Sequence, residues 1–128
     1  MTDKRDLSGA NLGLAQLAGA DLHDANFTRA NLVGANLVGA NLSGCDLSYA
    51  DLRQANLVGA NFTRANLTGA NLRDANLTHA NLSLATLSYA ELHGAHFGGA
   101  NLTDANFEHA HVIGAIMPTN WEQVVWKS

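Results

Sequence analysis

The sequence is poor in cysteine, proline, aromatic residues and charge. Its 128 residues include one cysteine and one proline, and only 6% are aromatic and 14% charged. A single cysteine excludes an internal disulfide. No apolar run reaches the length of a signal peptide or a membrane-spanning helix, and the first five residues are polar. We therefore expect a cytoplasmic protein with no membrane contact.

Basic residues are also few, and the formal net charge is −4. Proteins that bind nucleic acid or anionic lipid do so largely through clustered Lys and Arg side chains. We therefore expect no direct binding of nucleic acid.

A five-residue repeat fills most of the chain. A small residue stands at every fifth position from Ala10 to Ala115, and it is Ala everywhere except at Cys45. An apolar residue, usually Leu or Phe, also recurs at every fifth position, from Leu7 to Met117. Asn or Asp stands between the small and the apolar residue in most repeats.

This period fits neither an α-helix nor a flat strand. Residues five apart on a helix are separated by about 140° and form no common face. On a strand they alternate between opposite faces. A solenoid accommodates the period, because each unit forms one short side and the chain turns at each corner. The Ala and Leu side chains then point to the axis, and the other residues of each unit point outward.

The run of Ala-Asn/Asp-Leu-x-x units resembles the pentapeptide-repeat family over almost the whole chain. The resemblance implies an all-β fold, a right-handed quadrilateral β-helix with about 20 residues per coil. We predict an N-terminal tail or minimal cap at 1–5, the β-helix at 6–117, and a short C-terminal capping helix at 118–128. Residues twenty apart should then stack on neighbouring coils.

The C-terminal segment carries the signals of that helix. Thr119 and Asn120 form a candidate N-cap, and Trp121 shares a helical face with Val124 that would cover the last coil. We predict end contacts at Trp121 and Trp126; packing of Trp126 at the edge of the cap is the alternative. The first coil has no predicted cap, and the C-terminal helix offers a second contact surface at the other end. Contact between the ends of two molecules would give an end-to-end homodimer.

One outward face of the predicted rod has no carboxylate and no Lys or Arg. On it Ala18, Val38 and Val58 should stack in an apolar column, with Val33 just round the corner. A flat, uncharged strip is a candidate docking surface for a protein partner. The alternative is that Val only favours an extended surface.

No set of residues predicts catalysis, a cofactor or a metal site. The glycines do not follow a phosphate-binding order, and a core full of Leu leaves no pocket. His93, His96 and His111 fall on adjoining corners of the predicted rod. Outward side chains on a convex rod should diverge, so we expect no metal to bind there.

Charged and hydroxyl side chains should form columns along the rod. Arg53 and Arg73 should stack, with Asp51 and Asp74 close enough to offset their charge. Two ladders of Ser and Thr are expected to pair across coils. Cys45 occupies an inward position and should be a buried, unreactive thiol.

These features predict a non-enzymatic structural or interaction module, a rigid rod that presents flat faces to a protein partner. The resemblance implies an alternative, since some pentapeptide-repeat proteins mimic duplex DNA, bind DNA gyrase or other type II topoisomerases, and protect gyrase from quinolones. Such mimicry needs dense negative charge along the rod. Here Arg residues interrupt the surface, at Arg29, Arg53, Arg64 and Arg73.

Overall fold

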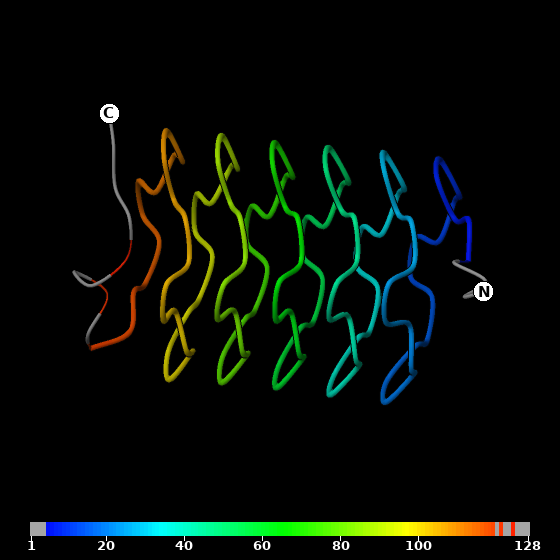
Figure 1. Cartoon of the computed structure of the whole chain (residues 1–128), viewed down its shortest axis with the longest axis horizontal. Coiled ribbons are helices and arrows are strands. Elements are labelled where there is room, and N and C mark those ends of the chain that lie inside the picture. Colours follow the sequence, from blue (N-terminus) through cyan, green and yellow to red (C-terminus); the bar gives the residue numbers. More distant parts are fainter. Residues whose placement is uncertain (1–4, 120, 122–123, 125–128) are drawn as a thin grey trace.

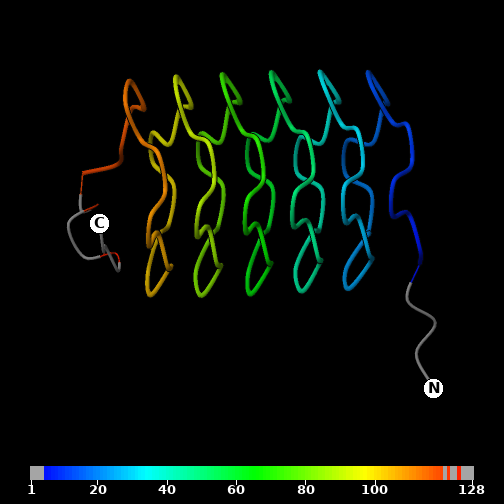
Figure 2. The same cartoon turned by 90° about the horizontal axis from the view of Figure 1, so that it is seen from above.

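The chain winds into a rod of stacked four-sided coils (Figures 1 and 2). This computed structural model describes residues 5–119, 121 and 124. Parallel bridges join residues twenty apart, from Asp6 with Asn26 to His96 with Ile116. Each side of a coil contributes one bridge residue. The described part of the chain therefore contains isolated β-bridges rather than extended strands. The stacking of residues twenty apart is therefore confirmed.

A β-turn closes every corner. The N–H of each small residue donates to the carbonyl three places before it, as Ala10 does to Leu7 at 3.0 Å. The third residue of each described turn has a positive φ and the second has not, which is the pattern of a type II turn. Glycine fits that third position best, as at Gly39 (φ 65°), but Leu14 and Gln54 also adopt it, each with φ 61°.

Hydrogen bonds between coils fix the register. The N–H of Leu52 donates to the carbonyl of Asn71 on the next coil at 2.7 Å, and the N–H of Asn71 donates back to Ala50 at 2.9 Å. The same pair of bonds recurs along the rod. Each side is thus held by its equivalents on the neighbouring coils, at the spacing of adjacent strands.

The core is the axis of the rod. Inward Leu, Phe and Ala side chains are buried from Leu22 to Phe107, and the middle Leu residues, such as Leu37 and Leu57, are completely inaccessible. Phe97 and Phe107 meet edge to face, with ring centroids 6.1 Å apart. No polar or charged residue in the described part of the chain is buried. The predicted inward positions are therefore confirmed.

The two ends of the rod are less well covered. Leu7, Leu12 and Leu17 of the first coil are only partly buried. At the other end Val124 is buried and packs against the core. The predicted capping helix at 118–128 falls mostly outside the described residues. Within it, Trp121 N–H donates to Pro118 and Val124 N–H to Trp121, both at 3.2 Å, which is the spacing of 3₁₀ turns.

Truncation of the core should cost more in the middle of the rod than at its first coil. Leu52→Ala leaves a cavity in a completely buried layer and should lower the free energy of unfolding by about 2–5 kcal/mol. Leu12→Ala removes a partly exposed side chain and should cost less. Urea denaturation followed by circular dichroism measures both variants. Equal losses would contradict the burial gradient along the rod.

Candidate functional site

The structure places Ala18, Val38 and Val58 in one column, as the register predicts. Ala18 is exposed, and the two Val residues are half-buried. The N–H of Val38 donates to Asn36 Oδ1 at 3.1 Å, so the backbone of this face has its polar groups satisfied. A Cβ added at the corner residue Gly39 would meet nothing within 4 Å. The corner next to this face is therefore bare at Gly39.

Val33 lies on the preceding side of its coil, before the corner at Gly34. A hollow of about 330 Å³ opens on that side, and its lining is mostly polar and charged: Val33, Arg53, Gln54, Arg73 and Asp74. The structure thus groups Val33 with charged residues, and the turn separates it from Val38.

On the same side, Glu91 gathers three basic side chains around one carboxylate oxygen. Its Oε2 lies 3.1 Å from His111 Nδ1, 3.3 Å from His93 Nε2 and 3.6 Å from Arg73 Nη2. The hydrogen bond from His111 is the largest influence, and with the nearby positive charges it holds the pKa of Glu91 below its ordinary value despite partial desolvation. The carboxylate is therefore ionised at neutral pH.

This cluster corrects the prediction that the outward histidines all diverge, because His93 and His111 lie close together beside Glu91. Arg73 pairs with Glu91, a partner that the sequence reasoning missed, rather than with Asp74. His96 does not join the other two histidines, because it lies on the uncharged face, where it bridges Asn76. Side chains diverge around the rod, but those of one column lie one coil apart and meet along it. The separation of twenty residues between Glu91 and His111 was the signal that could have found the cluster.

Elsewhere the charges pair over short distances. Arg53 Nε and Nη2 donate to the two carboxylate oxygens of Asp51 at 2.8 and 2.7 Å, and this hydrogen bonding lowers the pKa of Asp51. His23 Nδ1 lies 2.7 Å from Asp21 Oδ1, a hydrogen bond that raises the pKa of His23 and lowers that of Asp21.

The Ser and Thr ladders are held locally, so the prediction that they pair across coils was wrong. Thr63 Oγ1 donates to Asn61 Oδ1 two residues before it at 2.6 Å, and the N–H of Thr63 donates to the same oxygen at 3.0 Å. Among the neutral side chains, it is amides that bond across coils, as Asn31 Nδ2 does to Asn11 Oδ1 at 3.2 Å. A short hydroxyl side chain reaches its own turn more easily than the next coil.

One corner of the rod carries stacked aromatic and cationic side chains. The guanidinium of Arg29 lies over the ring of Tyr49, 5.0 Å from its centroid. Tyr89 stacks on His109, with centroids 4.8 Å apart and planes 21° from parallel. Tyr49 lies so close over Gly69 that an added Cβ there would come within 2.5 Å of the ring. Tyr49 and Tyr89 nevertheless remain more than half exposed, at 54% and 59%.

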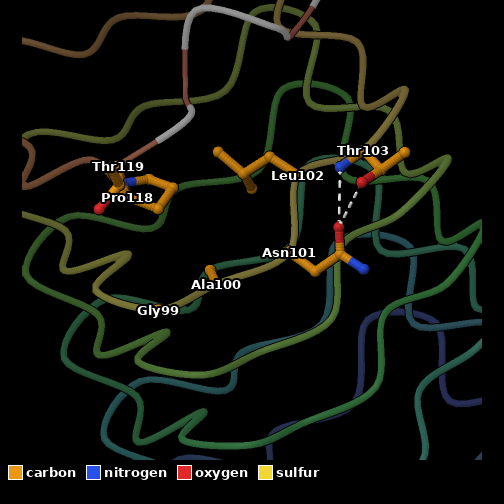
Figure 3. Close-up of a pocket in the computed structure, with 7 residues that line it drawn as sticks. All are labelled: Gly99, Ala100, Asn101, Leu102, Thr103, Pro118 and Thr119. Atoms are coloured by element: carbon orange, nitrogen blue, oxygen red, sulfur yellow. Dashed lines mark hydrogen bonds between the residues drawn. The ribbon is translucent and has the colours of Figure 1, made fainter.

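The predicted end contacts are only partly described. Trp121 is 41% exposed, and Trp126 lies outside the described residues. Near Trp121 a pocket of about 240 Å³ lies between the last coils and Pro118 (Figure 3). Asn101 Oδ1 in its wall already accepts hydrogen bonds from the N–H and hydroxyl of Thr103. Among the residues that the structure describes, no side chain lining this pocket is an acid, a base or a thiol.

Cys45 is buried, as predicted, with its side chain in the core. Its Sγ donates to the carbonyl of Leu22 at 3.0 Å. Burial raises the pKa of the Cys45 thiol to about 11, because the charged thiolate is disfavoured away from water. The thiol is therefore protonated and inert at neutral pH.

A filled apolar axis wrapped by four-sided coils defines a right-handed quadrilateral β-helix, which confirms the predicted fold class. The chain belongs to the pentapeptide-repeat family: the model for pentapeptide repeats matches residues 6–44, 45–83 and 80–117, in 8 copies. Proteins of this family are generally structural or interaction modules rather than enzymes. No curated protein matches the sequence.

Solved structures of pentapeptide-repeat proteins are similar to this chain. Rfr23 from the cyanobacterium Cyanothece 51142 is 31% identical, with a TM-score of 0.77 over 96% of this chain and 92% of that chain. The protein alr5209 from Nostoc PCC 7120 is also 31% identical, with a TM-score of 0.47 over 97% and 86%. QnrB1, a plasmid-mediated fluoroquinolone resistance protein, is 17% identical with a TM-score of 0.52 over 98% and 91%. The likeness to QnrB1 extends to the fold alone. In the described part of the chain, no helix is long and apolar enough to cross a membrane.

The buried thiol should make stability depend on pH in the alkaline range. The folded state holds the Cys45 proton more tightly than the unfolded state, so this contribution is intact below about pH 9 and is lost as the pH rises towards 11. Relative to Cys45→Ala, the wild type should lose about 2 kcal/mol across that window. Urea titrations of both proteins at pH 8 to 11 measure the difference, since Tyr and Lys titrate alike in both. A constant difference would contradict the raised pKa.

Proposed function

We propose that this chain is a non-enzymatic interaction module, a rigid rod that offers a flat face to a protein partner. The observation that best supports the proposal is the filled axis. The inward Leu and Phe side chains of the middle coils are completely buried, so the interior has no room for a substrate. The described residues that line the pocket near the C-terminal end include no acid, base or thiol. Chemistry is thus confined to the convex exterior, which suits binding better than catalysis.

The uncharged face is the surface that we assign to the partner. Val38 and Val58 give it apolar area, and hydrogen bonds to Asn36 and Asn56 satisfy the N–H groups of both residues. A protein partner that covers this face removes no charged side chain from water, so binding carries no cost of desolvating a charge. The whole chain, with both ends and the terminal segments included, exposes 6289 Å², so one of four sides exposes up to about 1,500 Å². That is about twice the 800 Å² that one protein contributes to a standard interface.

DNA mimicry is the weaker alternative. The acidic groups do not form a bare, phosphate-like array: Asp51 pairs with Arg53, and Arg73 lies beside Glu91. A carboxylate that a neighbouring Arg neutralises attracts a positively charged DNA-binding groove less than the phosphates of the two DNA strands do. The likeness to QnrB1, at 17% identity, carries only the fold.

End-to-end association stays a prediction. Leu7 and Leu12 of the first coil are partly exposed, which leaves an apolar end on which another molecule could stack.

A charge placed on the uncharged face should abolish partner binding. Val38→Arg/Val58→Arg is expected to reduce the recovered partner at least about tenfold in affinity capture from the native cell, because buried unpaired Arg costs at least 1.4 kcal/mol. Thr63→Arg/Ser83→Arg, with the same added charge on another side, is the matched control and should retain the partner. Thermal melts confirm that both variants fold. Equal recovery with both variants would overturn the assignment of the face.

The DNA-mimic alternative is tested by DNA gyrase itself. We expect no inhibition of supercoiling and no protection from a quinolone at micromolar protein, because the negative charge is sparse and arginines interrupt it. A gel assay with QnrB1 as the positive control measures both effects. Inhibition by this chain would replace the first proposal with the second.

A further inference from the structure

We propose that Glu91, His93 and His111 form a binding site for one Zn²⁺ ion on the side of the rod. Each residue offers one ligand atom, and the three atoms all lie within 4.8 Å of one another. The inference does not depend on the proposed docking face, because none of its residues belongs to the Val38 column.

The distances suit a small tetrahedral ion. With Zn–N and Zn–O bonds of about 2.0–2.1 Å, ligand atoms on one tetrahedral zinc lie about 3.3 Å apart. The oxygen of Glu91 lies 3.3 Å from the nitrogen of His93 and 3.1 Å from that of His111. Two edges of the tetrahedron are therefore already in place. The two imidazole rings are tilted by 50° with centroids 6.3 Å apart, so neither covers the other.

The backbone holds all three ligands in register. Glu91 and His111 form a parallel bridge, and Leu92 N–H donates to the carbonyl of His111 at 2.8 Å. Asp74 N–H donates to the carbonyl of His93 at 2.9 Å. Ligands on fixed ladder positions lose little conformational entropy when they bind an ion.

These residues also depart from the repeat. The bridge positions before Glu91 in its column are Asn or Asp, at Asn11, Asn31, Asp51 and Asn71. The carboxylate of Asp51 accepts a hydrogen bond from the backbone N–H of Arg53, two residues later. The longer side chain of Glu91 lies beside the imidazole of His93, two residues later, and the imidazole of His111 on the next coil. The side chains of His93 and His111 are 36% and 58% exposed, so an ion can enter from solvent.

Two imidazoles and one carboxylate select the class of metal. Imidazole suits Zn²⁺ and its neighbours in the first transition row, whereas Mg²⁺ and Ca²⁺ require mainly oxygen ligands. Three protein ligands leave the fourth position of Zn²⁺ for water or for a side chain of another molecule. The guanidinium of Arg73, 3.6 Å from Glu91 Oε2, competes with the ion for the same oxygen.

The test is isothermal titration of Zn²⁺ into the full chain without a polyhistidine tag. We expect one ion per chain, and we expect Glu91→Gln, His93→Ala and His111→Ala each to weaken binding at least about tenfold. Arg73→Gln should strengthen it by about three- to tenfold, because a competing positive charge is removed. His96→Ala, a histidine on another face, is the matched control and should bind like the wild type. Mg²⁺ should give no response.

Cobalt provides an independent readout of geometry. Co²⁺ in this site should show the intense visible absorption of a four-coordinate ion, and that absorption should disappear in His111→Ala. Thermal melts without metal check that each variant folds. The proposal is overturned if the folded wild type binds no Zn²⁺ at 1:1 stoichiometry, or if the Glu91, His93 and His111 variants bind as well as His96→Ala does.

Discussion

The structure depends on one contact made again and again: each inward Leu or Phe lies on its equivalent one coil away, at the spacing of a parallel β-ladder. The bonds that hold this spacing, such as Leu52 N–H to Asn71, tie neighbouring coils and nothing more distant. Stability is therefore a sum over neighbouring coils. A middle layer has a partner on both sides, and the Leu7 and Leu12 layer has a partner on one.

The same β-ladder determines which outward side chains come into contact. Each corner turns the chain, so residues on adjoining sides point in different directions. Residues in one column are brought to within side-chain reach along the axis, and this is where the rod gathers its chemistry. Arg29 over Tyr49, Tyr89 on His109 and Glu91 beside His111 are all pairs of one column. A convex solenoid without an internal cavity can thus still assemble a cluster of ligands.

The sides of the rod carry different outward residues. The Val38 and Val58 column lies on a face without formal charge, and the preceding side carries the Glu91 cluster with Arg53 and Arg73. The corner at Gly39 is bare, whereas Tyr49 covers Gly69 at another. Sides with one backbone geometry therefore differ only in their outward residues, which is how a single repeat can present several unlike surfaces to partners and ions.

The sequence by itself determined the period, the inward positions, the register of twenty and the composition of each face. It could do so because every unit repeats one local solution, so local pattern and global fold coincide. The burial of Cys45 followed from its place in the Ala series. Only the tertiary structure decided where the outward side chains reach: Thr63 to its own turn, and Glu91 to the histidines. The repeat shows which residues are neighbours, but the choice between those neighbours depends on the length of each side chain and on the partners within its reach, and the pattern alone does not decide it.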